Sequence, residues 1–152
     1  MVDASRITGR LFVGSAPEPS PFLARHFDVL VLCAEEYQPS SRNFPGLTVV
    51  HAGFDDGPGL DGRQEKIVEG AATIVRKELD KGKRVLVTCA QGRNRSGLVA
   101  SLALMLPGSG PTPSCLSGRE VIHLMKGRRG PGALTNEYFQ RILKALRLCP
   151  AG

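Results

Sequence analysis

Residues 89–96 place a cysteine and two arginines in a short polar stretch between apolar segments. The stretch reads Cys-Ala-Gln-Gly-Arg-Asn-Arg-Ser and follows the apolar run 85–88. In a loop of this length, backbone N–H groups can converge on one point, and a following helix adds partial positive charge there. The guanidinium of Arg95 is a planar fork that matches two phosphate oxygens. The pattern predicts an anion cradle that favours the thiolate of Cys89, a nucleophile toward phosphorus.

Each of these residues alone also has an ordinary structural explanation. A single cysteine at the end of a buried strand is most often a small core residue, and an arginine near a helix start is most often a solvated charge. Cys89 and Arg95 at this spacing, before the apolar segment 96–106, favour a functional loop instead. Gly92 fits this interpretation because it permits backbone conformations that a side chain would block.

The elements that must position this loop alternate between strands and helices. Continuous apolar runs predict buried strands, and apolar positions at helical spacing predict helices. We therefore expect an α/β protein with a central, mostly parallel sheet of four to five strands flanked by helices on both faces. In such sheets ligands bind at the carboxyl ends of the strands, where Cys89 lies. The expected strands are 10–14, 29–33, 47–51 and 85–88, and the expected helices follow residues 61, 95, 117 and 135.

Capping residues mark three of the expected helix starts. Asp61 with Gln64 and Ser117 with Glu120 have the spacing of a capping box. Thr135 is expected to cap the last helix, because a hydroxyl just before an apolar helical pattern can accept from the first free N–H groups.

Length and composition describe an ordinary globular chain. The 152 residues are enough for a single buried core, and 41% of them are hydrophobic. The net charge of +6 favours anionic partners such as phosphorylated ligands, nucleic acid or an acidic membrane surface. Aromatic residues make up only 5% and tryptophan is absent, so we expect no nucleic-acid partner that stacks bases on rings.

The four cysteines indicate neither a metal site nor a disulfide framework. Cys33, Cys89, Cys115 and Cys149 have no CxxC spacing, and a chain of this length does not need disulfides to form a core. The longest apolar run, 98–106, is too short to span a bilayer, and the first residues do not resemble a signal peptide. We therefore expect a cytoplasmic protein without a membrane span.

The sequence also resembles a known family. Cys89 and Arg95 with five residues between them, followed by Ser96, resemble the signature loop of the cysteine-dependent protein tyrosine and dual-specificity phosphatases. Residues 54–58 are similar to the general-acid loop of this family, and residues 128–139 are similar to the late segment of compact dual-specificity phosphatases. The resemblance covers most of the chain and implies a protein tyrosine phosphatase-like fold with one catalytic domain over the whole sequence.

The resemblance implies a two-step hydrolysis of a phosphate monoester. Cys89 would form a phosphocysteine, and Asp56 would protonate the leaving oxygen and then activate water. Arg95 and the loop amides would hold the phosphate oxygens, and Ser96 would hydrogen-bond the sulfur and help to expel it. No metal or cofactor is required. The residues implied to bind phosphate are Ala90, Gln91, Gly92, Arg93, Asn94 and Arg95.

The match to the family pattern leaves one role open between two residues and departs from the pattern at one position. Asp55 competes with Asp56 for the role of general acid, and the position of Asp56, one residue before Gly57 and two before Pro58, favours Asp56. Thr88 stands where the family usually has histidine. A hydroxyl can support the loop, so we expect this change to affect the rate and pH optimum but not the reaction.

The substrate is less constrained than the reaction. A compact chain suggests a shallow site open to phosphotyrosine, and also to phosphoserine or phosphothreonine, of proteins. Arg93 adds a second cation, and residues 92–96 are similar to loops of phosphatases that act on phospholipid head groups. Those enzymes usually carry lysine directly after the cysteine, where this chain has Ala90. The sequence leaves the oligomeric state open.

Cys33 is a candidate redox partner of the nucleophile. Residues 32–37 are similar to a strand end of the phosphatase-and-tensin-homologue lipid phosphatase, in which the corresponding cysteine pairs with the nucleophile. The carboxyl ends of the strands at Cys33 and Cys89 should be neighbours in this fold. The alternative is that Cys33 is an apolar core residue without chemistry.

Two readings from other classes remain. A rhodanese-like sulfurtransferase also uses a loop cysteine at a strand end, but it would not require Asp56. An inactive phosphate-binding module would not need Cys89, Arg95 and an acid together.

Overall fold

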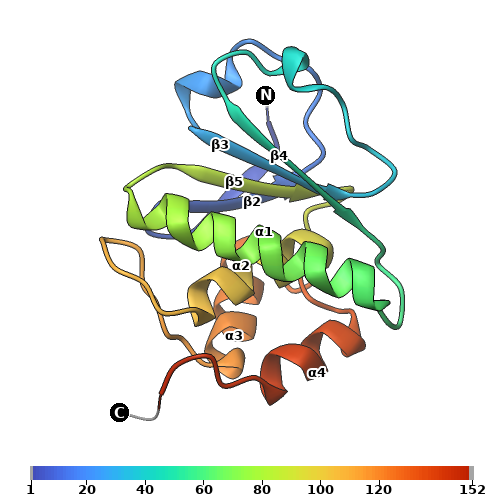
Figure 1. The fold of residues 1–152 in the computed structure, drawn as a ribbon, viewed down its shortest axis with the longest axis vertical. Helices are drawn as coiled ribbons and strands as arrows, with labels where there is room; N and C mark the ends of the chain where they lie inside the picture. The colour runs from blue at the N-terminus through green and yellow to red at the C-terminus, as the bar shows by residue number, and fades with distance from the viewer. Residues whose placement is uncertain (1, 151–152) are drawn as a thin grey trace.

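The computed structural model describes residues 2–150, which form a five-stranded sheet and four α-helices (Figure 1). Short 3-10 helices, η1 and η2, follow the second and third strands. The elements are β1 (Ala4–Thr8), β2 (Leu11–Ser15), η1 (Leu23–Arg25), β3 (Val29–Ala34), η2 (Ser41–Asn43), β4 (Thr48–Phe54), α1 (Gly62–Asp80), β5 (Val85–Cys89), α2 (Arg95–Met105), α3 (Gly118–Arg129) and α4 (Glu137–Ala145).

The sheet has the strand order β1-β2-β5-β3-β4. The four strands β2, β5, β3 and β4 are parallel, which confirms the predicted mostly parallel sheet. β1 was not among the predicted strands. It adds antiparallel to β2 through a tight turn at Gly9, whose φ of +58° suits glycine. Only Ile7 of β1 is buried, so this edge strand lacks the continuous apolar run that marks the central strands.

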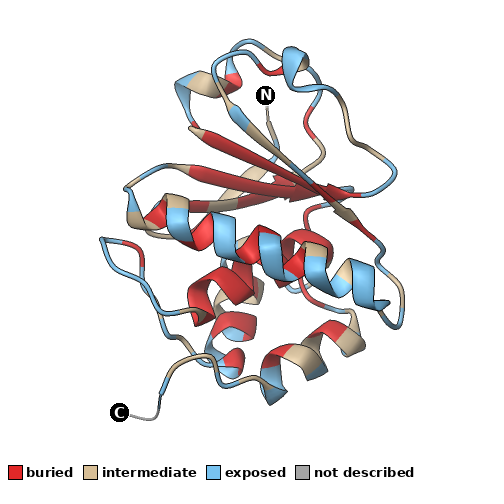
Figure 2. Ribbon diagram, in the orientation of Figure 1, coloured by how far each residue is buried: buried red, intermediate tan, exposed pale blue. Residues whose placement is uncertain are grey.

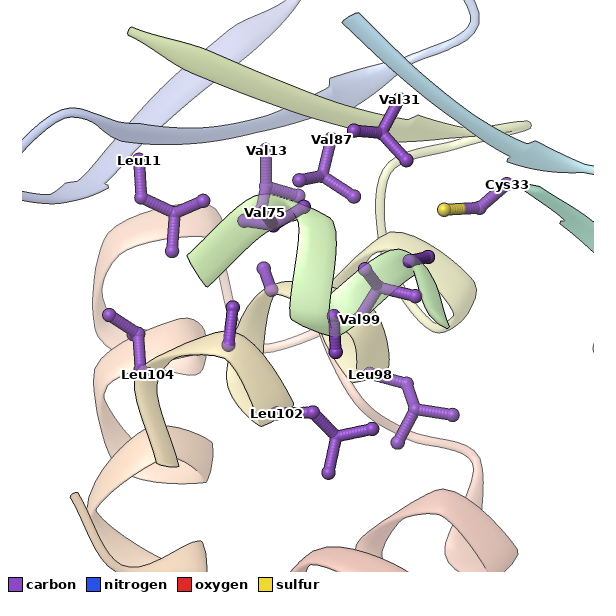
Figure 3. Close-up of a cluster of buried hydrophobic side chains, with 14 of the residues drawn as sticks. Leu11, Val13, Val31, Cys33, Val75, Val87, Leu98, Val99, Leu102 and Leu104 are labelled. Atoms are coloured by element: carbon purple, nitrogen blue, oxygen red, sulfur yellow. The ribbon is translucent and has the colours of Figure 1, made fainter. Parts of the chain in front are cut away.

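The two faces of the sheet are covered unequally. All four α-helices pack on one face, and η1 and η2 with their loops cover the other (Figure 1). β3 shows the alternation: Val29, Val31 and Cys33 point into the large cluster beneath the helices, and Leu30 and Leu32 point into the smaller one. Figure 3 shows part of the large cluster, in which side chains of the sheet face those of α1 and α2, with Cys33 at its edge. Helices on both faces were expected, and the second face carries only single turns.

Helix α2 runs through the centre of the molecule. All of its residues from Arg95 to Met105 are buried (Figure 2). A helix that is apolar all round needs neighbours on every side, and α2 contacts α1, α3, α4 and the sheet. Its N-terminus is therefore fixed in place directly after β5. Within residues 2–150, no helix is long and apolar enough to cross a membrane.

The N-terminal caps of α1 and α3 are as predicted, but the cap of α4 is not Thr135. Asn136 caps this helix, because its side chain accepts a hydrogen bond from the backbone N–H of Phe139. Thr135 lies one residue too early, and its hydroxyl faces Asn94 at 3.5 Å. The sequence offers two adjacent capping residues, and the tertiary contacts of the site select between them.

A disulfide joins Cys115 and Cys149, although the sequence indicated no disulfide framework and the chain is long enough to form a core without one. It joins the connector between α2 and α3 to the segment after α4, with a Cα–Cα distance of 5.7 Å. Backbone hydrogen bonds from Cys115 and Leu116 to carbonyls of Leu106 and Leu104 turn the connector back along the end of α2. The two cysteines meet because α3 and α4 pair side by side, which spacing along the chain does not reveal.

An ion pair at the start of the central strands leads to a stability prediction. Asp28 accepts three hydrogen bonds from Arg84, which lower its pKa from 3.8 to about 2. A carboxyl with a lowered pKa stabilises the fold above its unfolded value, and this contribution is lost as the pH falls through about 2. Asp28→Asn is expected to lower the Tm at neutral pH by about 2–4 °C and to flatten the loss of stability below pH 4. Thermal unfolding followed from pH 7 to pH 2 measures both effects.

Glu18→Gln is the matched control, because Glu18 is exposed and has no hydrogen-bond partner among residues 2–150. A pH dependence in Asp28→Asn as steep as that of the wild type would show that this pair does not contribute to acid unfolding.

Candidate active site

The loop predicted from residues 89–96 joins β5 to α2. Cys89 is the last residue of β5, and α2 begins at Arg95. Gly92 has a φ of +67°, and a Cβ at this position would lie 2.5 Å from the carbonyl carbon of Gly14. Only glycine fits there. The hollow above the loop has a volume of about 280 Å³ and is lined by Asp56, Cys89, Ala90, Gln91, Arg93, Asn94, Arg95 and Thr135.

The carbonyl oxygens of this loop accept hydrogen bonds from groups outside it. Arg129, at the end of α3, donates to the carbonyls of Gln91 and Gly92 at 3.0 and 2.9 Å. The N–H groups of residues 91–94 donate to no other group in residues 2–150. They can therefore donate to a bound anion. The remaining donors to the loop are the backbone N–H of Ala16 to Ala90 and that of Leu134 to Arg93.

Arg129 is itself held by a carboxylate. Its two terminal nitrogens bind both oxygens of Asp3, which precedes β1, at 2.9 and 2.8 Å. The side chain of Arg129 is only 9% exposed, whereas that of Asp3 is 64% exposed. The N-terminal strand thus fixes the arginine that supports the loop from behind. No role was assigned to either residue from the sequence.

Cys89 lies at the floor of the hollow and is 4% exposed. Its sulfur is 3.2 Å from the hydroxyl oxygen of Ser96, which is fully buried at the first turn of α2. A buried hydroxyl at this distance can donate a hydrogen bond to a thiolate. The structure therefore brings together the residues proposed as nucleophile and as the group that assists its departure.

Arg95 is oriented by Glu36, in the turn that follows β3. The two terminal nitrogens bind the two carboxylate oxygens at 2.6 and 2.7 Å, and one of them also donates to the carbonyl of Phe54. The Nε of Arg95 is buried and has no partner. The edge formed by Nε and the adjacent N–H remains available, and it has the spacing for two oxygens of a phosphate.

The ion pair between Arg95 and Glu36 is ionised over the whole physiological pH range. Hydrogen bonds from the guanidinium lower the pKa of Glu36 to about 2, and Glu36 raises the pKa of Arg95. The sequence assigned no role to Glu36. The available signal was an acidic residue directly after the carboxyl end of a central strand, where side chains reach the ligand edge of a parallel sheet.

Asp56 reaches the same hollow from the segment between β4 and α1. One carboxylate oxygen accepts from the side-chain amide of Asn94 at 3.2 Å and the other from that of Asn136 at 2.9 Å. Asp55 is not among the residues that line the hollow. Its backbone N–H donates to the side chain of Gln64 in α1. Of the two candidates for the acid, the structure brings Asp56 to the nucleophile loop.

Thr88 and Cys33 lie beneath the loop, on neighbouring strands. The Thr88 hydroxyl donates to the carbonyl of Val31 at 3.0 Å and ties β5 to β3. Leu32 pairs with Thr88, so Cys33 and Cys89 come next on two adjacent parallel strands. Burial raises the pKa of the Cys33 thiol well above its usual value, and the neighbouring Cys89 acts in the same direction.

The orientation of Arg95 by Glu36 can be tested through anion binding. Glu36→Ala removes the carboxylate that holds one edge of the guanidinium, so the free edge is no longer fixed toward the cradle. We expect the Kd for inorganic phosphate to rise about tenfold, which corresponds to about 1.4 kcal/mol. Arg95→Lys should weaken binding at least as much, because an ammonium cannot replace the fork. Titration calorimetry or competition against a substrate measures the change.

Glu35→Ala is the matched control for Glu36→Ala, because it removes the adjacent exposed carboxylate, which does not contact Arg95. Equal phosphate binding by the Glu35 and Glu36 variants would mean that the ion pair does not prepare the site.

Comparison with known proteins identifies solved structures that share this architecture. No family model and no curated protein sequence matches the chain. Among solved structures, the active form of the phosphatase Tk-PTP is 27% identical with a TM-score of 0.77, over 95% of this chain and 96% of that one. Human DUSP28 is 23% identical with a TM-score of 0.71, over 93% and 90%. A mouse putative dual specificity phosphatase, crystallised with zinc tungstate, is 23% identical with a TM-score of 0.73, over 95% and 86%.

These structures share the fold along nearly the whole chain, and Tk-PTP also shares about a quarter of its residues with it. The cysteine and arginine of the loop have the family spacing, and the hollow holds both of them. The chain therefore shares the fold of the cysteine-dependent protein tyrosine and dual-specificity phosphatases, which hydrolyse phosphoric monoesters, together with the spacing of cysteine and arginine in their signature loop.

Proposed function

We propose that this phosphatase removes phosphate from proteins through a phosphocysteine intermediate on Cys89, with phosphotyrosine as the first substrate class and phosphoserine and phosphothreonine as further ones. The observation that carries the proposal is the convergence of Cys89, Arg95 and Asp56 on one hollow of about 280 Å³. A nucleophile, an anion-binding fork and a proton donor are the three groups that this reaction requires.

In the first step the Cys89 thiolate attacks phosphorus while the bond from phosphorus to the leaving oxygen breaks. Protonated Asp56 gives its proton to that oxygen, so the product leaves as a neutral alcohol or phenol. The free edge of Arg95 and the unpaired N–H groups of residues 91–94 stabilise the charge on the other phosphate oxygens.

In the second step a water molecule attacks the phosphocysteine. The carboxylate of Asp56 takes a proton from the water, the bond between sulfur and phosphorus breaks, and inorganic phosphate forms. The hydroxyl of Ser96, 3.2 Å from the sulfur, donates to the departing thiolate. Ser96 therefore acts mainly in this step, when negative charge returns to sulfur.

The surroundings of the hollow support a protein substrate over a lipid. Asp56, Gln91, Arg93 and Thr135 at the rim are all exposed, so a phosphorylated side chain can reach the floor without a deep cleft. Arg93 is the one observation that favours a phospholipid head group, since it adds an exposed cation. Ala90 lies where the lipid phosphatases usually have lysine, which makes the lipid reading the second candidate.

A cytoplasmic location and a single catalytic domain over residues 1–152 stay predictions. The Cys115–Cys149 disulfide weighs against a strongly reducing compartment, where such bonds are rare.

The decisive experiment is Cys89→Ser. This variant should lose turnover of a small aryl phosphate without added metal, and it should still bind inorganic phosphate because the amides and Arg95 are unchanged. Release of phosphate from tyrosine-phosphorylated peptides, threonine-phosphorylated peptides and phosphoinositides ranks the substrate classes. Turnover that persists in Cys89→Ser would falsify the mechanism.

A thiosulfate-to-cyanide transfer assay on the same preparation covers the sulfurtransferase reading. Phosphate binding without any turnover in the wild type would indicate an inactive phosphate-binding module.

Cys33 is proposed as the redox partner of Cys89. Adjacent strands lie about 4.8 Å apart, and a disulfide requires Cα atoms within about 7 Å. Hydrogen peroxide would oxidise the Cys89 thiolate to a sulfenic acid and release hydroxide, which takes up a proton from solvent to become water. The Cys33 thiol would then attack that sulfur, and a second water would leave as the disulfide forms. The raised pKa of Cys33 makes this second reaction slow, because a thiolate is the attacking species.

We expect peroxide-treated wild type to regain most of its activity with dithiothreitol and Cys33→Ser to regain several-fold less. Mass spectrometry of the peroxide-treated wild type before reduction should find the peptides of Cys33 and Cys89 linked. Equal recovery of the two proteins would eliminate the partner role and leave Cys33 as a core residue.

A further inference from the structure

The carboxylate of Asp56 is held by two amides from different parts of the chain. Asn94 belongs to the nucleophile loop, and Asn136 is the N-cap of α4. The two asparagines also bind each other, because the backbone N–H of Asn136 donates to the side-chain oxygen of Asn94 at 2.9 Å. The three side chains form one connected network across the mouth of the site.

Asn136 has several partners at once. Its side-chain oxygen accepts from the N–H of Phe139, which caps α4. Its side-chain nitrogen donates to Asp56 at 2.9 Å and to the carbonyl of Gly57 at 3.0 Å. The same amide therefore caps α4 and binds the segment that carries Asp56 through one side chain and one backbone carbonyl.

The segment from residue 55 to residue 61 has few other contacts that fix its position. None of its residues is buried, and a Cβ added at Gly59 would meet nothing within 4 Å. Its other hydrogen bonds within residues 2–150 lie at its two ends, where Asp55 and Asp61 bind Gln64 and the carbonyl of Asp61 accepts from the N–H of Glu65. Without the two asparagines, the middle of the segment has no fixed position relative to Cys89.

We propose that Asn136 is a positioning residue for Asp56, which it holds over the nucleophile loop before substrate binds. Asn94 completes the link, so that the acid segment, the loop and the start of α4 are fixed as one unit. This inference rests on the proposed function, since it assigns Asn136 a role in the proton transfer by Asp56. A positioned acid gains from orientation that would otherwise be lost to the mobility of the segment.

The role predicts a specific kinetic signature. Proton donation matters most when the leaving oxygen is strongly basic, and it matters little for an acidic phenol that can leave as the anion. Loss of the hydrogen bond to Asp56 should therefore slow the hydrolysis of substrates with basic leaving groups and leave that of substrates with acidic leaving groups almost unchanged. Loss of a helix cap alone would lower stability or slow all substrates alike.

Asn136→Asp is the sharpest variant. Aspartate caps helices about as well as asparagine, so α4 keeps its first turn. The donor to Asp56 and Gly57 is replaced by an acceptor, which breaks both contacts and places two carboxylates together. Asn136→Ala removes the donor without adding charge. Ser117→Ala is the control, because it removes the equivalent cap from α3, whose N-terminus contributes no residue to the hollow.

We expect both Asn136 variants to lower kcat/KM at least tenfold for an aryl phosphate with a basic leaving group and less than threefold for one with an acidic leaving group. Ser117→Ala should change both substrates by the same factor. In a double-mutant cycle, Asn136→Ala added to Asp56→Asn should cause little further loss, because the acid that it positions is already absent.

Equal losses for both leaving groups, or losses that multiply fully in the double variant, would overturn the role of Asn136. Failure of the proposed function gives a different result, since turnover would then survive Cys89→Ser. A Tm of Asn136→Asp close to that of the wild type would assign its kinetic loss to positioning. If Asn136→Asp is unfolded at the assay temperature, Asn136→Ala provides the test instead.

Discussion

A loop that directs its N–H groups toward one anion must turn its carbonyl oxygens outward, where each needs a donor. Four successive carbonyls, from Ala90 to Arg93, receive one. The donors come from the end of β2, from α3 and from the segment before α4. The cradle is thus shaped by distant elements as much as by its own short sequence, and the packing of α3 and α4 beneath α2 is a condition for its geometry.

The two arginines of the site, whose side chains are largely covered, share one arrangement. Arg95 faces the hollow and Arg129 lies behind the loop, with side chains 8% and 9% exposed. Each is bound through both terminal nitrogens by a carboxylate that remains largely exposed, Glu36 or Asp3. Because the acids keep their contact with water, their desolvation cost is smaller than that of a fully buried pair. The chain fixes two guanidinium planes in this way.

The residues of the loop that we propose to react could be located from the sequence, because their types and spacing are local. Cys89, Arg95 and Ser96 lie within eight residues, and the strand and helix on either side have clear apolar patterns. Asp56 could be proposed only through the resemblance to a family, since its distance from the loop along the chain carries no physical signal.

The supporting residues could not be predicted. Glu36, Arg129 and Asn136 are ordinary polar residues in sequence, and each acquires its role through a contact more than thirty-five positions away. Thr135 was the wrong cap for the same reason, because contacts with Asp56 and Asn94 place its neighbour Asn136 at the start of α4. β1 was missed because an edge strand buries little, and the disulfide because its two cysteines meet only after α3 and α4 have paired.

The disulfide encloses more of the site than its position suggests. Between Cys115 and Cys149 lie α3 and α4, and with them Arg129, Leu134 and Asn136. These three residues supply outer hydrogen bonds to the nucleophile loop or to the acid. Closing a ring of this size removes about 4 kcal/mol of chain entropy from the unfolded state in the simplest treatment. The covalent ring therefore limits how far Arg129, Leu134 and Asn136 can separate from one another when α4 frays. Reduction of this disulfide would loosen the residues that support the proposed phosphate site, although neither cysteine lies in that site.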